Sequence, residues 1–478
     1  MGRFSLTLLV LLWMGLGLTA AGAERSERFG IEWVRKHPFT IMGLTQRVET
    51  LDAQQYRAAG LTTLLAWKPR EGLFEAAVKD GLPWHYYAVN KARFEDPSNP
   101  SPEAIESMKA TAKKFYDTYP GCTGWVIWDE FKRPELPHIA ACIEWFRSTF
   151  PDTLVYSNAY PMGAPAGKYY GSKWVSSGVY EDPPIPYGYD DYLAEYVSVC
   201  KPDVLVFDIY PFKDGGAEGP YSPGTYFGSL EAVRACALKA EIPYWEFIQS
   251  YERGEPGTGG ARPLPSESDL RMQIFSSLAY GFTGIIYFTY DVAFKRGLLE
   301  PDGSPSRLYP QAARANAEVT NLGSALRFLT SAGVYYIAGR HLENGGVVSN
   351  SPPAPVKPLD ADAGKAWGIS AIRVKEKGAD KDGLVGFFRD DQGGRYFMLV
   401  NLWRSPDAPA AERSLTMTAE FAPSVTTVGR LSRATGEPEL ISVGDGLLKI
   451  ALPGGTGELF KIGDADFPGR AASALAPE

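Results

Sequence analysis

The sequence predicts a (β/α)8 TIM barrel followed by a C-terminal antiparallel β-sandwich. Eight short apolar segments alternate with segments of helical spacing in the N-terminal part of the chain, and eight βα units in about 290 residues are typical of a closed barrel. From Val334 onward, short alternating segments follow one another between Gly-rich turns, as in an antiparallel sandwich. The alternative for the first part is an open doubly wound sheet, which usually carries a Gly-rich phosphate loop after its first strand. Gly43-Leu44-Thr45 is not such a loop.

The N-terminus resembles a secretory leader, predicted to cover residues 1–23. Arg3 supplies a positive charge, residues 8–18 form an apolar core, and Ala21-Gly22-Ala23 is a small-residue cleavage site. The apolar core is short for a bilayer span. We therefore expect a secreted or periplasmic protein with no membrane attachment after leader cleavage, and a retained anchor is the alternative.

The barrel is predicted to occupy residues 24–332. Its strands are expected where unbroken apolar runs indicate burial on both faces. These strands are residues 39–44, 61–67, 83–89, 124–130, 154–158, 204–210, 244–249 and 284–290. The helices between them are expected at residues 51–59, 71–79, 102–119, 136–150, 191–200, 228–240 and 309–329. One more helix, before the last of these, is expected to begin at Ser266 or Ser268. Ser101 before Pro102 is a typical helix start. The loops at 160–187 and 251–265 are long enough to wall a cleft.

The sandwich is predicted to span residues 333–463. Its strands are expected at residues 384–388, 396–402, 414–418, 425–431, 447–452 and 458–462. Residues 350–364 are rich in Pro and Asp and are expected to form an exposed loop. The Ala/Pro-rich tail, residues 464–478, is expected to be disordered.

Composition narrows the function classes. The net charge of −8 argues against nucleic acid and anionic membranes as partners. Four cysteines, at positions 122, 142, 200 and 236, permit two disulfides in an exported protein, with the sequence neighbours paired, or four buried thiols. The four histidines are scattered without a metal-binding spacing, so we expect no metal and no cofactor. Aromatic residues are numerous, at 13%; most are expected in a large aromatic core, and some are expected to stack on sugar rings at a cleft.

Two glutamates are the candidate catalytic pair. The run Gly124-Trp125-Val126-Ile127-Trp128 stops at Asp129 and Glu130, and Glu246 follows Trp245 on the seventh predicted strand. Acids at the carboxyl ends of barrel strands lie at the mouth, where such folds carry their chemistry. Glycoside hydrolysis needs one carboxyl to protonate the leaving oxygen and another to attack the anomeric carbon or activate water. For each acid the structural alternative is an ion pair with Arg or Lys. Glu246 lies inside its apolar run and not at the end of it. Glu252 and Glu255, in the loop that follows, are therefore alternative candidates for the second catalytic carboxylate.

These motifs resemble the retaining glycoside hydrolases of the clan that includes cellulase-like and β-galactosidase-like enzymes. Trp128-Asp129-Glu130 and Trp245-Glu246 are similar to that clan's acid/base and nucleophile segments, and residues 277–290 and 453–460 are similar to parts of its β-galactosidase-like members. The resemblance implies a double displacement in which Glu246 attacks the sugar and Glu130 is the acid/base. Asp129 is a departure, because much of the clan has Asn there.

Further candidates end the predicted strands, where they would bind hydroxyls or stack on sugar rings. These substrate-binding candidates are Asp129, Asp208, Tyr210, Asn158, Trp67, Trp128, Trp245, Gln249, Tyr290 and Asp291, with Tyr160 and Asn90 beside them. Many of the aromatic members have a core position as their alternative.

The predicted function is glycoside hydrolysis of a poly- or oligosaccharide, with carbohydrate as the partner and the oligomeric state open. Two alternatives remain, because one fold hosts many functions. One is a non-catalytic carbohydrate-binding protein on a barrel scaffold. The other is an inverting glycosidase that uses Asp129 or Asp208 with Glu130. The direction of the Glu246 side chain distinguishes hydrolysis from binding. A side chain that points into the barrel wall favours carbohydrate binding without hydrolysis.

Overall fold

The computed structural model describes residues 25–49, 51–176, 178–214, 222–258, 260–375 and 378–469. The expected leader lies outside these ranges. Within them, no helix is both long and apolar enough to cross a membrane.

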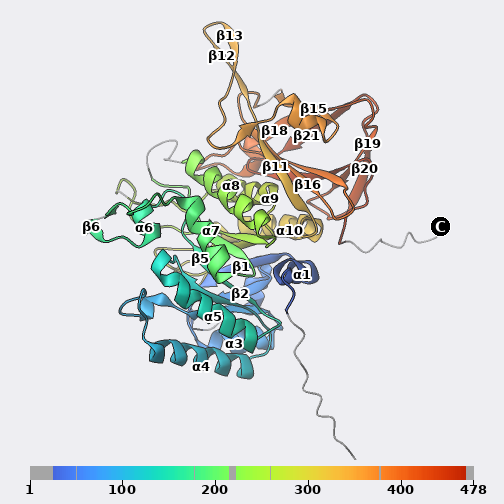
Figure 1. The fold of residues 1–478 in the computed structure, drawn as a ribbon. Coiled ribbons are helices and arrows are strands. Elements are labelled where there is room, and N and C mark those ends of the chain that lie inside the picture. The colour runs from blue at the N-terminus through green and yellow to red at the C-terminus, as the bar shows by residue number, and fades with distance from the viewer. Residues whose placement is uncertain are drawn as a thin grey trace, which may run out of the picture.

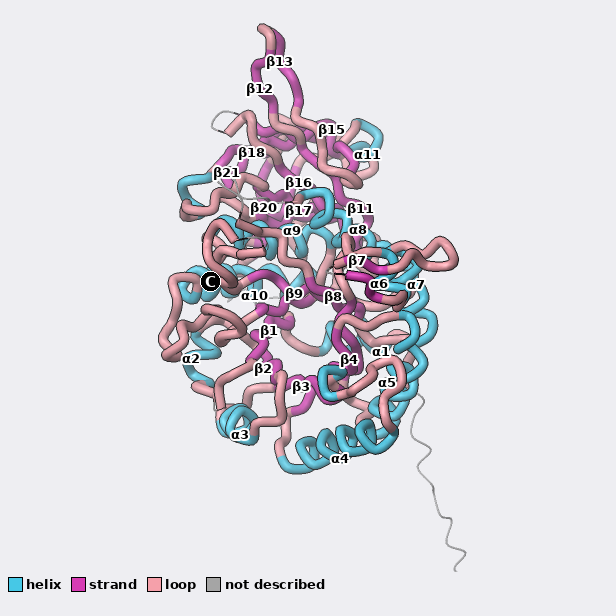
Figure 2. Tube along the Cα trace, turned by 90° about the vertical axis from the view of Figure 1, so that its left-hand side faces the viewer, coloured by secondary structure: helices cyan, strands magenta, loops and turns pink. Residues whose placement is uncertain are grey.

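Eight parallel strands form a closed barrel, which confirms the predicted fold class (Figure 2). The ring closes because β1 pairs with both β2 and β10. In chain order the barrel strands are β1 (Thr40–Thr45), β2 (Thr63–Ala66), β3 (Trp84–Val89), β4 (Cys122–Asp129), β5 (Leu154–Ala159), β8 (Leu205–Asp208), β9 (Tyr244–Gln249) and β10 (Gly284–Phe288). All eight predicted strands are present.

Helices cover the outside of the barrel (Figure 1). They are α2 (Ala53–Ala58), α3 (Glu71–Lys79), α4 (Pro102–Thr118), α5 (Leu136–Thr149), α7 (Tyr189–Cys200), α8 (Pro223–Lys239), α9 (Glu267–Tyr280) and α10 (Tyr309–Leu326). Ser101 caps α4, accepting a hydrogen bond from the Ala104 amide at 3.1 Å. Ser266 caps α9 through the Asp269 amide at 3.0 Å. Every residue of α9 is buried because the helix lies between the barrel and the C-terminal sheet.

The barrel interior is a packed core. Side chains from alternate strand positions fill it, among them Tyr87, Tyr156, Trp245 and Phe247. Trp33 of α1 (Phe29–Lys36) joins this cluster, so the helix packs against the interior; this helix was not predicted. Filled interiors are usual for eight-stranded barrels.

The C-terminal part is a β-sandwich, as predicted. A seven-stranded sheet, β14-β11-β16-β17-β22-β19-β20, packs on a three-stranded sheet, β15-β18-β21, around a shared apolar cluster. The strands are β11 (Thr330–Ile337), β14 (Lys357–Pro358), β15 (Ile369–Lys375), β16 (Gly383–Arg389), β17 (Arg395–Asn401), β18 (Leu415–Phe421), β19 (Thr427–Leu431), β20 (Pro438–Ser442), β21 (Leu447–Leu452) and β22 (Gly457–Ile462). The hairpin β12 (Arg340–Glu343) and β13 (Gly346–Ser349) projects from it (Figure 1).

Several sequence expectations need correction here. The boundary expected at 332/333 falls within β11, so the sandwich begins earlier. The segment expected as a loop at 350–364 contains β14 and most of α11 (Ala361–Lys365). In the tail, Phe467 is buried 5.9 Å from the Tyr396 ring, so residues up to 469 pack on the sandwich; the rest of the tail lies outside the described ranges. All four cysteines are free thiols, so the expected disulfide pairs are wrong.

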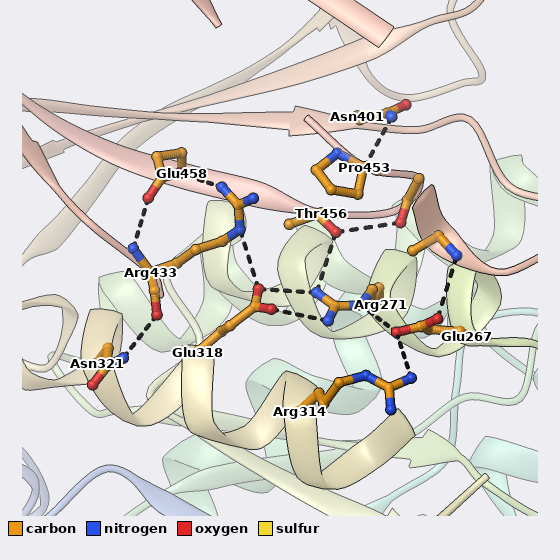
Figure 3. Close-up of polar contacts among 12 residues, drawn as sticks. Glu267, Arg271, Arg314, Glu318, Asn321, Asn401, Arg433, Pro453, Thr456 and Glu458 are labelled. Carbon is orange, nitrogen blue, oxygen red and sulfur yellow. Dashed lines mark hydrogen bonds and ion pairs between the residues drawn. The ribbon is translucent and has the colours of Figure 1, made fainter. Parts of the chain in front are cut away.

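A buried polar network joins the two parts of the molecule (Figure 3). Glu318 of α10 accepts two hydrogen bonds from Arg271 of α9, both at 2.9 Å, and pairs with Arg433 at 3.2 Å. Arg433 also pairs with the fully buried Glu458 of β22. One carboxylate thus holds two guanidinium groups, one from the barrel side and one from the sandwich.

Candidate active site

A cavity of about 640 Å³ opens at the carboxyl ends of the barrel strands. The ends of β4, β5 and β8 contribute Asp129, Asn158 and Asp208 to its lining. The segment 160–164 and Lys168 form one wall, so part of the long loop at 160–187 walls a cleft as predicted. Tyr251, Arg253 and Arg262 come from the second predicted loop.

Three carboxyl groups, Asp129, Glu130 and Asp208, form an acidic cluster in this cavity. Asn158 bridges two of them, because its Nδ2 lies 3.0 Å from Asp129 Oδ1 and 3.3 Å from Asp208 Oδ1. Asp129 Oδ1 and Asp208 Oδ1 can therefore be no farther apart than the sum of these two distances. Asn158 Oδ1 has no partner among the described residues, which leaves a buried acceptor free for a ligand hydroxyl.

The backbone at the end of β4 explains why two neighbouring acids reach one cavity. Trp128 and Glu130 have φ values of 81° and 44°, in the left-handed region, and the pairing of β4 with β5 is irregular between Val126 and Asp129. Such conformations cost about 1–3 kcal/mol each and persist where the surroundings enforce them, often at functional sites. Here the Glu130 amide donates to the Asn158 carbonyl at 2.8 Å, and Lys91 donates to the Glu130 carbonyl.

The environment raises the pKa of all three acids. Burial raises the pKa of Asp129, opposed by the Asn158 hydrogen bond and Lys91. Burial and then Asp129 raise the pKa of Glu130, opposed by Lys168 and Lys91. Burial, followed by the charges of Glu130 and Asp129, raises the pKa of Asp208 well above its usual value. Since adjacent like charges cannot all ionise easily, the cluster keeps a proton at higher pH than separate carboxyls would.

Aromatic side chains flank the acids. Trp67 and Tyr87 pack against each other with ring centroids 4.5 Å apart, and Tyr210 lies 5.1 Å from Phe288. All four line the cavity. Rings beside acids suit a ligand with both apolar faces and hydroxyl groups, as sugars have.

The structure brings six of the predicted site residues to the cavity. They are Glu130, Asp129, Asp208, Tyr210, Asn158 and Trp67, and Tyr160 joins them.

The predicted position of Glu246 is wrong. Its side chain is 0% exposed, accepts a hydrogen bond from Ser277 of α9, and leaves Oε1 without a partner among the described residues. Alternation along β9 places Trp245 and Phe247 inside the barrel and therefore turns Glu246 outward. Burial raises its pKa well above the usual value. Glu246 and Glu130 do not face each other, so the expected pairing of Glu246 as nucleophile with Glu130 is contradicted.

Five other candidates lie outside the cavity lining. Trp128 donates to Glu135 at 2.8 Å, and Trp245 donates to Thr283 at 3.2 Å in the barrel core. Tyr290 donates to Gln55 at 3.0 Å. Each ring is at most 1% exposed and has its polar atom satisfied within the fold, so none of these three is a stacking or binding group here.

Gln249 and Asp291 hold loops that line the cavity. Gln249 bonds both the amide and the carbonyl of Phe212, at 2.9 and 3.0 Å. Asp291 accepts the amides of Gln46, Arg47 and Val48 at 2.8, 2.5 and 2.9 Å. Their role is positioning instead of the expected substrate binding.

Sequence reasoning missed the basic and several aromatic lining residues. These are Tyr87, Lys168, Lys213, Phe247, Tyr251, Arg253, Arg262, Phe288 and Phe294. The available signal was their location at the ends of predicted strands or in the loops that follow. No group of three or more His, Cys, Asp and Glu in the described ranges is placed to hold a metal ion.

Comparison with solved structures gives distant barrel matches. A β-galactosidase from the psychrophilic Marinomonas ef1 aligns with a TM-score of 0.42 and 10% identity over 61% of this chain and 62% of that chain. A glycoside hydrolase family 5 mannosidase from Rhizomucor miehei gives 0.38 and 11% over 57% and 88%. A Lactobacillus rhamnosus β-glucuronidase gives 0.41 and 12% over 59% and 50%. The chain thus spans less than two thirds of the first and third of these proteins.

No protein-family model matches the chain, and no curated protein sequence matches it. The function therefore has to be inferred from the cavity itself.

Proposed function

We propose that this protein is a glycoside hydrolase that cleaves an oligo- or polysaccharide in the cavity at the barrel mouth. The observation that carries the proposal is the acidic cluster, in which Asp129, Glu130 and Asp208 converge with raised pKa values beside aromatic side chains. Hydrolysis of a glycosidic bond needs one protonated and one ionised carboxyl group, and a cluster that keeps a proton provides both.

Glu130 is assigned as the proton donor. Burial and then the charge of Asp129 raise its pKa, against the opposing charges of Lys168 and Lys91, so it keeps a proton at higher pH than a free glutamate does. Its proton passes to the glycosidic oxygen as the bond from that oxygen to the anomeric carbon breaks. The sugar leaves with a hydroxyl group, and positive charge develops on the anomeric carbon.

Asp208 is assigned as the second carboxylate, with Asn158 holding it and Asp129 in place. It either takes a proton from the attacking water or bonds to the anomeric carbon before water does. The first gives inversion at that carbon and the second gives retention, so the anomer of the initial product distinguishes the two.

The test is release of reducing sugar from a panel of oligo- and polysaccharides, with wild type compared with Glu130→Gln. Removal of general acid catalysis lowers the rate about 10²–10⁴-fold. Glu246→Gln is the matched control, because this glutamate lies outside the cavity lining and its exchange is expected to leave the rate unchanged. A panel on which wild type and Glu130→Gln release sugar equally contradicts the proposal.

A second function is favoured by the orientation of Glu246. Its side chain lies in the barrel wall, which removes the expected carboxylate from strand seven and favours carbohydrate binding without hydrolysis. In that case oligosaccharides bind wild type and Glu130→Gln alike, and neither releases reducing sugar.

A further inference from the structure

Basic side chains line one side of the cavity. Lys168, Lys213, Arg253 and Arg262 all contribute to its lining, and we call them the basic wall. They follow β5, β8 and β9, which are neighbours in the barrel order. The basic wall is therefore a continuous arc of the mouth.

Among the described residues, no side chain of the basic wall forms an ion pair with an acid, although the charge of Lys168 lowers the pKa of Glu130. Arg262 donates to the carbonyl oxygens of Tyr210 and Phe212, at 2.6 and 3.3 Å. The Arg253 guanidinium lies 4.9 Å from the Phe294 ring centroid, and Lys168 Nζ lies 4.2 Å from that of Tyr160. Carbonyl groups and rings orient a cation but leave its net charge in place.

The remaining sides of the cavity differ in character. The lining residues on or after β1, β2, β3 and β10 carry no charge; they include Gln46, Trp67, Tyr87 and Phe288. The acids of the cavity are those of the acidic cluster, whose raised pKa values reduce their negative charge. A chain with a net charge of −8 thus presents four cationic side chains along one side of the cavity at its barrel mouth.

Such an arrangement suits an anionic ligand. Clefts lined by one sign of charge concentrate ligands of the opposite sign, and Arg and Lys are the residues that bind carboxylate and sulfate oxygens. A neutral sugar would add no counter-charge to these cations.

We propose that the saccharide bound in this cavity is acidic, carrying carboxylate or sulfate groups that the basic wall holds while its ring faces lie along Trp67, Tyr87 and Phe288. This proposal rests on the proposed function only where it takes the bound saccharide to be the substrate whose glycosidic bond is cleaved. The binding preference itself does not require cleavage.

The test measures binding to Glu130→Gln by calorimetry, so that turnover does not interfere. The probes are oligogalacturonate and oligoglucuronate for the carboxylate, sulfated galactan oligosaccharides for the sulfate, and galactose and glucose oligomers of equal length as neutral counterparts. At least one acidic series is expected to bind roughly tenfold more tightly than its neutral counterpart, and the difference should shrink as salt is raised. Which series binds identifies the anionic group.

Variants test whether the basic wall is the cause. Lys213→Met and Arg253→Met, combined in the Glu130→Gln background, keep apolar stems and are expected to remove most of the preference. Lys173→Met is the control, because Lys173 is an exposed cation close to Lys168 in the chain but lies outside the cavity lining. A preference that survives in the double variant overturns the proposal.

The failure of this inference is distinct from the failure of the proposed function. Equal or tighter binding of neutral oligomers overturns the acidic substrate, even if the enzyme hydrolyses them. Tight binding of an acidic series without any hydrolysis by wild type supports the basic wall and contradicts the hydrolase.

Discussion

At the scale of single residues, the chemistry depends on the peptide that ends β4. Its left-handed φ values at Trp128 and Glu130 turn the indole out to Glu135 and bring two successive carboxyls to the cavity. The sequence predicted Glu130 because two acids end an apolar run at the mouth. It could not predict Glu246 correctly, because β9 is apolar on both faces and the chain does not reveal which face is inside.

The pH dependence of activity tests the role of Asp129. Its charge raises the pKa of Glu130, and a proton donor is active only below its pKa. Activity is therefore lost as pH rises through this pKa, which lies above that of a free glutamate. Asp129→Asn removes the nearby charge, so the alkaline limb of kcat/KM against pH is expected to move to lower pH. An unmoved limb, or one displaced to higher pH, contradicts this coupling.

At the scale of elements, buried polar side chains fix the loops of the mouth. Asp291 after β10 holds the three amides that follow β1, and Gln249 holds Phe212 after β8. The sequence placed both residues at strand ends correctly. Whether such a side chain faces a ligand or a loop amide depends on loop paths that the sequence pattern does not determine.

Asp291→Ala is expected to loosen the loop after β1. A buried donor left unpaired costs about 1–3 kcal/mol, and these three amides are only partly buried, so the variant should lose about 1–2 kcal/mol of unfolding free energy in denaturant titration. KM should rise more than kcat falls, because Gln46 lines the wall and not the acidic cluster. Asp291→Asn keeps one acceptor oxygen and should therefore lose less unfolding free energy than Asp291→Ala. Equal stability of Asp291→Ala and wild type would exclude this anchoring role.

The seam between β9 and α9 gives a prediction on stability. Glu246 has a raised pKa in the fold, so the neutral acid is the stable buried form. The stability that it contributes is complete below the unfolded pKa and is lost as pH rises through the folded pKa. Glu246→Gln cannot ionise, so its unfolding free energy should come closest to that of wild type below the ordinary glutamate pKa of about 4.3 and should exceed it increasingly as pH rises from there towards the folded pKa. Chemical denaturation across this range measures the difference, and a variant that is less stable at pH 9 would refute the neutral state.

At the scale of the whole molecule, the barrel and the sandwich share a buried interface. Hydrophobic periodicity predicted both architectures, because eight βα units and a later series of alternating strands leave clear patterns. It missed α1, the hairpin β12–β13 and the sandwich strands β11, β14, β15 and β20. The short helix α1 buries only Trp33 and Val34 in the cluster of the barrel interior, and the hairpin leaves its apolar residues Leu342 and Val347 exposed. Neither element therefore shows the long amphipathic pattern by which periodicity detects helices and strands.

Glu318→Ala tests whether the polar network of Figure 3 couples the two parts. The variant removes two ion pairs at once, but Arg271 keeps Glu267 and Arg433 keeps Glu458, so the loss should stay below the roughly 3–5 kcal/mol of a buried charge left alone. We expect a lower midpoint, with separate unfolding transitions for barrel and sandwich in calorimetry. Asp117→Ala is the control, because its pair with Lys113 is more than half exposed and such pairs contribute about 0.2–1 kcal/mol. Equal effects of the two variants would contradict the coupling.

The central claim is that protons move between the acidic cluster and the glycosidic oxygen, and the dependence of rate on the leaving group tests it most directly. kcat/KM is measured for Glu130→Gln and Asp208→Asn on aryl glycosides whose leaving groups range from phenol to dinitrophenol. A missing proton donor matters least when the leaving group departs unaided, so Glu130→Gln should approach wild type on dinitrophenyl glycosides, while Asp208→Asn should remain slow on all of them. Equal losses of Glu130→Gln across the whole series would contradict the assignment of Glu130 as the acid.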